Sequence, residues 1–191
     1  MHRLALTDED KQARDLFVQW LKELGLEITV DEMGNIFGKR KGRSPQLAMV
    51  LSGSHLDTQP KGGRFDGILG VTGALEALRT IHENRIDTER SIAIVDWTDE
   101  EGTRFAPAML GSGVWAGHFD RDWAYARADL REKTSERHWK RSGTREKRRR
   151  GNRLSMPTMN FILNKGRFWK RWVNESDCPK EFSELPGSMF M

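Results

Sequence analysis

With 191 residues, the chain is long enough for one domain with a sizeable core and short for two. Residues 1–130 carry 16 Lys and Arg against 21 Asp and Glu, a net charge of −5, whereas residues 131–191 carry 16 against 7, a net charge of +9. The single cysteine, Cys178, excludes an internal disulfide, and no apolar run approaches the roughly 18 residues of a membrane helix. We therefore expect a cytoplasmic protein with neither a signal peptide nor a membrane span.

The first predicted element is an amphipathic helix. Thr7 is its expected N-cap, and apolar residues recur at helical spacing as far as Leu24, where Gly25 ends the pattern. Two short strands are expected next, at Leu26–Val30 and Asn35–Gly38, joined by a turn.

Two buried strands with a helix between them follow. Leu47–Leu51 is a continuous apolar run, typical of a strand buried on both faces, and Ile92–Val95 is a second one. Between them, the segment Val71–Ile81 repeats its apolar residues at helical spacing. This order predicts an α/β fold, a mixed sheet flanked by helices with some parallel pairing. In such sheets, ligands bind at the ends of the strands that carry the loops.

Polar side chains follow these elements in separate clusters. His55 and Asp57 are two residues apart on an extended chain and point to the same side, so a carboxylate can orient a metal-binding imidazole. The alternative is a histidine at a strand end with a local hydrogen bond. Asp66 lies among glycines at the expected start of the second helix. A metal can approach closely there, but a simple capping role also suits an aspartate in that position.

A third cluster, Asp99-Glu100-Glu101, follows the second buried strand. Neighbouring carboxylates repel each other, and this cost is relieved if one binds a divalent cation while another acts as a general base. A solvated acidic turn is the ordinary alternative. A histidine, an aspartate and a glutamate on three loops of one sheet are together what a pair of cations needs, with one carboxylate bridging both ions. The conjunction of the clusters therefore favours a metal site.

Four segments carry a family resemblance: Ser52–Thr58 (SGSHLDT), Gly62–Val71 (GGRFDGILGV), Asp99–Phe105 (DEEGTRF) and Met109–Val114 (MLGSGV). Together they resemble the zinc- or manganese-dependent N-carbamoyl-L-amino-acid hydrolases, allantoate amidohydrolases and β-ureidopropionases, which belong to the aminoacylase and carboxypeptidase clan. The resemblance covers roughly residues 3–129. It implies hydrolysis of carbon–nitrogen bonds in small ureido or amide compounds, such as N-carbamoyl-L-amino acids or allantoate.

The resemblance also implies a role for each polar cluster. His55 binds one metal, Asp66 bridges both metals, Glu101 binds the other, and Glu100 is the general base. Asp57 is the carboxylate behind His55. Such ligands suit two divalent ions, and the choice among zinc, manganese and cobalt stays open. The other histidines match no family ligand and are expected to be surface residues: His2, His82, His118 and His138.

The chain departs from the family after its first two thirds. The family continues with a further metal-binding histidine in a stretch similar to A-Y-x-E-x-H-I-E-Q-G-P-x-L-E, then a lid and dimerisation domain, and then a last metal-binding histidine. None of these appears here. Each metal would therefore lack one protein ligand, and the dimerisation domain of the family homodimer is missing, so this chain is expected to be an inactive fragment.

The codons of the tail offer an explanation. If each new codon takes the third base of one codon and the first two of the next, residues 131–144 permit G-K-D-I and A-L-E-A-I-G-Y, and residues 156–170 permit A-Y-Y-E-F-H-I-E-Q-G-P-I-L-E. We therefore predict a partial catalytic domain over residues 1–130 and a basic, disordered or out-of-frame tail over residues 131–191. Nucleic-acid binding is then not expected. The alternative is a non-catalytic remnant whose basic tail binds nucleic acid or a partner protein.

An out-of-frame tail should lack a cooperative core, because its hydrophobic period was never matched to a secondary structure. Limited proteolysis should cut first within Arg131–Arg153, and hydrogen exchange there should be fast compared with Leu47–Leu51 and Ile92–Val95. Protection of the tail equal to that of these strands would contradict the frameshift. Genomic sequence across the codons for residues 125–135 is an independent check, with an intact downstream frame as the expected result.

Overall fold

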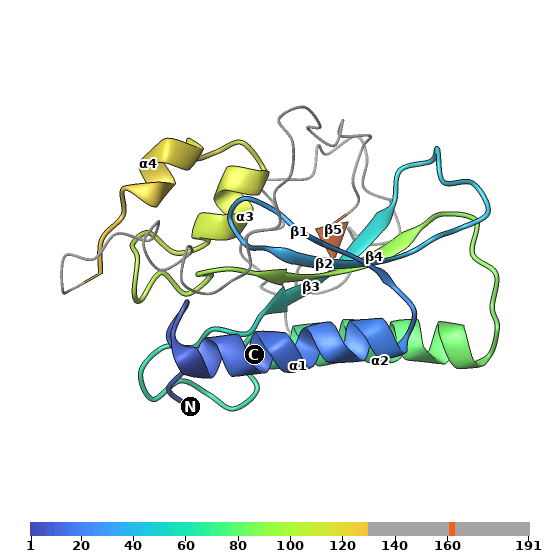
Figure 1. The fold of residues 1–191 in the computed structure, drawn as a ribbon, viewed down its shortest axis with the longest axis horizontal. Helices are drawn as coiled ribbons and strands as arrows, with labels where there is room; N and C mark the ends of the chain where they lie inside the picture. The colour runs from blue at the N-terminus through green and yellow to red at the C-terminus, as the bar shows by residue number, and fades with distance from the viewer. Residues whose placement is uncertain (130–160, 163–191) are drawn as a thin grey trace, which may run out of the picture.

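The computed structural model of the protein describes residues 1–129 and 161–162, so most of the predicted tail over 131–191 lies outside the described residues. One mixed sheet flanked by helices accounts for the described part (Figure 1), which confirms the predicted fold class. Its elements are, in chain order, α1 (Asp8–Glu23), β1 (Glu27–Val30), β2 (Ile36–Arg40), β3 (Val50–His55), α2 (Ile68–Glu83), β4 (Ile92–Trp97), α3 (Leu110–Trp115), α4 (Arg121–Tyr125) and β5 (Phe161–Ile162).

The sheet has the strand order β1-β2-β4-β3-β5. β1 and β2 form an antiparallel hairpin, and β2 is antiparallel to β4, whereas β3 is parallel to both β4 and β5. A parallel pair cannot be joined by a tight turn, and α2 provides the crossover between β3 and β4. The carboxyl ends of β3 and β4 therefore meet at the same edge of the sheet.

The first helix begins and ends as predicted. The Thr7 hydroxyl accepts a hydrogen bond from the Asp10 amide at 3.3 Å, and three acidic residues occupy the first turn, where the helix dipole favours negative charge. Gly25 follows the helix with a φ of +63°, a conformation that costs glycine little. The helix buries Phe17 and Leu21 against the sheet.

The third strand differs from its prediction. It runs over Val50–His55 rather than Leu47–Leu51, and the Leu47 side chain is 37% exposed. Register with β4 explains the shift, because pairing starts at Val50 opposite Ile92. Buried and half-buried residues alternate along β3, so it is not the strand buried on both faces that its apolar run predicted. As a result, His55 is the last residue of the strand itself.

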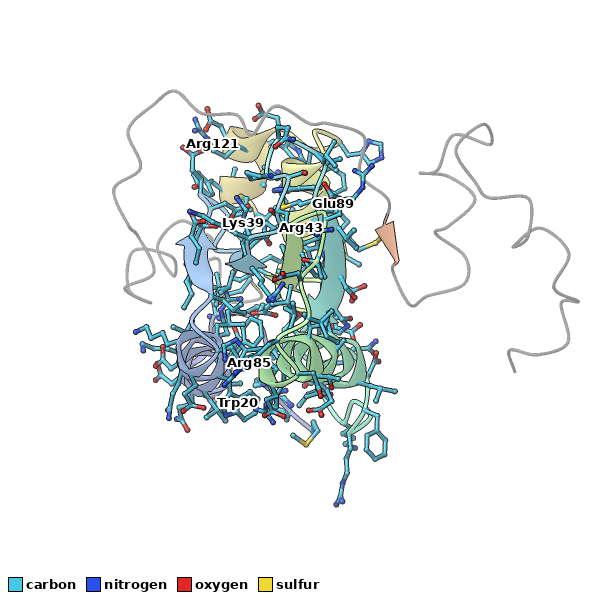
Figure 2. All side chains as sticks on the ribbon, turned by 90° about the vertical axis from the view of Figure 1, so that its right-hand side faces the viewer. Trp20, Lys39, Arg43, Arg85, Glu89 and Arg121 are labelled. Carbon is cyan, nitrogen blue, oxygen red and sulfur yellow. The ribbon has the colours of Figure 1, made fainter. Side chains whose placement is uncertain are left out.

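Both long helices cover one face of the sheet. α1 packs on β1 and β2, and α2 packs on β3 and β4; Figure 2 shows the two helices end-on, side by side, beneath the sheet. Ten buried apolar residues form the core of this layer: Phe17, Leu21, Leu24, Leu26, Ile36, Leu56, Val71, Leu75, Leu78 and Ile94. None of the helices in the described part of the chain is long and apolar enough to span a membrane.

An aromatic cluster lies on the other face. The Trp97 ring at the end of β4 is 5.7 Å from the ring of Phe37 and 5.3 Å from that of Trp115, which belongs to α3. The rings meet edge to face, the arrangement that aromatic quadrupoles favour. This cluster anchors α3 against the sheet next to the carboxyl end of β4.

A buried ion pair joins α1 to the same end of β4. The Arg14 guanidinium lies 3.2 Å from an Asp96 carboxylate oxygen, and both side chains are almost fully buried. Arg14 also donates to the Thr98 hydroxyl at 2.9 Å and to the carbonyl of Gly34. Since removing one partner would leave the other charge buried and unpaired, this contact fixes the helix relative to the strand end.

Asn35 connects three segments at this edge and is completely buried. Its amide nitrogen donates to the Asp31 carboxylate at 2.8 Å and to the Gly111 carbonyl at 3.1 Å. Its amide oxygen accepts from the Thr98 amide at 3.0 Å. The hairpin, the end of β4 and the start of α3 are therefore held by one side chain.

Asn35→Ala should lower the free energy of unfolding by roughly 1–3 kcal/mol for each buried group left unpaired. Asn84→Ala is the matched control, because the Asn84 side chain is exposed and its amide donates to the Thr80 carbonyl in the last turn of α2. Its effect should stay within about 0.5 kcal/mol. Equal losses in urea denaturation of the two variants would contradict the structural role of Asn35.

Candidate metal centre

Three polar side chains from different elements converge at the edge where β3 and β4 end. His55 is the last residue of β3, Asp66 precedes α2, and Glu101 follows β4. One ligand atom from each lies within 4.8 Å of the others, so the group can hold a metal ion. These are the three metal ligands that the sequence predicts, and the structure brings them together.

The His55 ring is buried and its orientation is fixed. Nδ1 lies 2.9 Å from the backbone carbonyl oxygen of Asp57, which can only accept, so Nδ1 carries the proton. Nε2 then points toward the acidic side chains, 3.2 Å from a Glu100 oxygen and 3.9 Å from an Asp66 oxygen. A neutral imidazole in this tautomer offers the Nε2 lone pair to a cation.

The Asp57 carboxylate makes its closest contacts with a different segment. Its two oxygens accept hydrogen bonds from the backbone amides of Glu100 and Glu101, each at 3.2 Å. The carboxylate lies farther from His55, at 3.6 Å from Nδ1. Asp57 thus contacts the imidazole mainly through its carbonyl and holds the Glu100-Glu101 turn through its side chain.

The acidic turn after β4 is not a solvated loop. Asp99 is 2% exposed and has a φ of +52°, and the Glu100 side chain is 17% exposed. On its far side, the Asp99 and Glu100 carbonyls accept from the amides of Leu110 at 3.1 Å and Met109 at 2.6 Å, where α3 begins. Hydrogen bonds therefore hold the turn on both sides, which disfavours the alternative of a solvated acidic turn.

Asp66 owes its position to the glycine that follows it. Gly67, not Asp66, is the N-cap residue of α2, and it has a φ of +71°. A Cβ on Gly67 would lie 2.5 Å from the His55 ring. Only a glycine allows the chain to pass this close to the imidazole while turning into the helix, and Asp66 then faces the Nε2 edge of the ring.

Buried polar atoms in the group fit a missing cation. His55 Nε2 and Glu101 Oε1 are both buried, and within residues 1–129 and 161–162 neither has a hydrogen-bond partner, although Nε2 lies 3.2 Å from a carboxylate oxygen of Glu100. Unsatisfied buried polar atoms are uncommon in folded proteins, and a bound cation would satisfy both of these. An imidazole nitrogen and two carboxylates are also a donor set that borderline divalent cations accept.

The charged side chains of the group shift the pKa values of their neighbours. Burial lowers the pKa of His55, but contacts with Asp57 and the negative charge of Glu100 outweigh it and raise the pKa to about 9. Burial and the neighbouring Asp57 raise the pKa of Asp99 to about 8. The raised pKa favours the protonated imidazole among these carboxylates when no cation is bound. Cation binding has to displace that proton.

The remaining histidines lie away from the group. His2, His82 and His118 are exposed, as predicted, and His138 lies outside the described residues. Sequence reasoning overlooked Gln59, whose side-chain amide donates to a Glu101 carboxylate oxygen at 2.9 Å. Its place between His55 and Asp66 was visible in the sequence, but the contact spans 42 residues and follows only from the fold.

Comparisons with known proteins identify the family of this segment. The model of peptidase family M20/M25/M40 matches residues 51–139, a segment that contains all three side chains of the group. Residues 51–139 belong to this family. The match continues past Leu130, and the domain boundary predicted there stays a prediction.

Individual proteins similar to the chain include amidohydrolases and an allantoate deiminase. An N-carbamoyl-L-amino-acid amidohydrolase of Rhizobium meliloti is 50% identical over 142 residues, which cover 74% of this chain and 34% of that protein. Allantoate deiminase 1 of Glycine max is 37% identical over 119 residues, 61% of this chain and 25% of that protein. The crystal structure of a hydantoinase/carbamoylase family amidase from Burkholderia ambifaria superimposes with a TM-score of 0.75 at 50% identity, over 78% of this chain and 36% of that chain. The chain thus spans about a third of the length of the Rhizobium meliloti protein and of the Burkholderia ambifaria amidase.

Gly67→Ala should destabilise the protein, since the new methyl group meets the His55 ring and the alanine must adopt a positive φ. A loss of at least about 1–2 kcal/mol in the free energy of unfolding is expected. Gly73→Ala is the control, because Gly73 is exposed within α2 and a Cβ there meets nothing within 4 Å. That variant should gain about 1 kcal/mol from helix propensity. Thermal unfolding of both, with opposite shifts expected, tests the close approach at Gly67.

Proposed function

We propose that the gene encodes a two-metal hydrolase of carbon–nitrogen bonds in small ureido or amide compounds, and that this chain holds the first half of its metal centre. The observation that carries the proposal is the convergence of His55, Asp66 and Glu101, with one ligand atom of each within 4.8 Å of the others. The relatives named N-carbamoyl-L-amino-acid amidohydrolase and allantoate deiminase support this substrate class. N-carbamoyl-L-amino acids and allantoate are the substrates to try first.

In the proposed centre, each side chain has one task. His55 would hold the first ion and Glu101 the second, and Asp66 would be shared between them. Zinc, manganese and cobalt all suit these ligands. Two-metal sites of this kind polarise a carbonyl oxygen and lower the pKa of water.

Glu100 is the proposed general base. One of its oxygens lies 3.2 Å from His55 Nε2, at the edge of the ligand group, and its side chain keeps some exposure to solvent. There it can take the proton of the attacking water while the water oxygen bonds to the amide carbon. The same carboxylic acid then returns the proton to the leaving nitrogen as the carbon–nitrogen bond breaks.

Metal binding by the 191-residue chain is the first test. Isothermal titration calorimetry with Zn²⁺ or Mn²⁺ should detect binding, and His55→Ala and Glu101→Ala should each weaken it at least about tenfold, since each removes a ligand. Glu100→Gln should still bind. His82→Ala removes an exposed histidine on α2 and is the matched control. Equal affinity in all variants would exclude the proposed ligand group.

Turnover is the second test, in the protein with the downstream frame restored. Glu100→Ala should reduce kcat roughly 10²- to 10⁴-fold while metal is still bound. Full activity in that variant would remove Glu100 from the mechanism. The 191-residue chain, loaded with zinc or manganese, should show no turnover above the metal blank.

A further inference from the structure

Glu101 receives a hydrogen bond from Gln59, a residue that the sequence did not predict to be part of the site. The Gln59 amide nitrogen lies 2.9 Å from Glu101 Oε2. The other oxygen, Oε1, is buried and has no hydrogen-bond partner in the part of the chain that the structure describes. The two oxygens of this carboxylate are therefore not equivalent, because one is occupied by a neutral donor and the other is left for a ligand.

The backbone around Gln59 is held in place. Thr58 exchanges hydrogen bonds with Arg3 in both directions: its amide donates to the Arg3 carbonyl at 2.7 Å, and its hydroxyl accepts from the Arg3 amide at 2.8 Å. The Gln59 carbonyl accepts from the Gly62 amide at 3.0 Å in a tight turn. Although the Gln59 side chain is exposed, hydrogen bonds hold the backbone before and after its Cα atom.

We propose that Gln59 is a positioning residue that holds Glu101 so that Oε1 alone faces the cation, which makes Glu101 a monodentate ligand. This inference rests on the proposed function. A neutral amide suits the task, because it takes one oxygen by a charge-assisted hydrogen bond and adds no positive charge that would compete with the metal. Groups that orient a metal ligand in this way typically change metal affinity 10- to 100-fold when they are removed.

The chain contains a matched control for this contact. Gln19 on α1 donates to a Glu23 carboxylate oxygen at the same distance, 2.9 Å, and the contact is also exposed. Gln19→Leu thus removes an equivalent hydrogen bond away from the metal group, and Gln59→Leu removes the one at the site with the same change in side chain.

Isothermal titration calorimetry of the full 191-residue chain with Mn²⁺ or Zn²⁺ tests the proposal, with thermal unfolding of the metal-free proteins alongside. Gln59→Leu should bind about tenfold more weakly than the unmodified chain, and Gln19→Leu should bind equally well. The unfolding temperatures without metal should match, because both glutamines are on the surface.

Other results would overturn the proposal in distinguishable ways. Unchanged affinity in Gln59→Leu would show that Glu101 needs no support from Gln59, and equal weakening in both variants would show that the effect is not local. An unmodified chain that binds no metal would reject the proposed function, and this inference with it.

Discussion

The parallel pairing of β3 with β4 is the constraint on which the site depends. Its register places His55 opposite Trp97, so the loops that follow the two strands leave the sheet side by side. Asp57 lies in one of these loops and the Glu100-Glu101 turn in the other, and the carboxylate of the first receives the two amides of the second. A shift of one residue in this pairing would exchange the faces of the strand and separate the groups.

Packing on both sides of the sheet supports that register. The ion pair between Arg14 and Asp96 holds α1 at the strand end, while the contact of Trp97 with Trp115 holds α3 on the opposite face. Burial raises the pKa of Asp96 to about 7, although the charge of Arg14 opposes the shift. The polar edge of the sheet thus contains side chains that are costly to bury. Asp96 is one of them, and it contacts Arg14 of α1.

The sequence predicted much of the fold and the identities of the grouped side chains. Apolar periodicity located both long helices and β4, and the conjunction of His55, Asp66 and the acidic turn pointed to one site. Periodicity misplaced β3, because its boundaries follow from pairing with β4 rather than from its own apolar run. The contacts of Asp57 and Gln59 span 42 to 44 residues, and no local pattern encodes contacts that depend on how two loops meet.

The grouping of three side chains from different elements has a consequence for the stability of the protein. The three grouped side chains come from the end of a strand, the start of a helix and the loop after a second strand, and no two of them are held in place without the native core. An ion that binds only this arrangement adds to the free energy of unfolding, by about 2.7 kcal/mol at a hundred times its Kd. Under the proposed function, the thermal stability of the chain would follow the free concentration of that ion, and a chelator would act on the whole fold rather than on one loop.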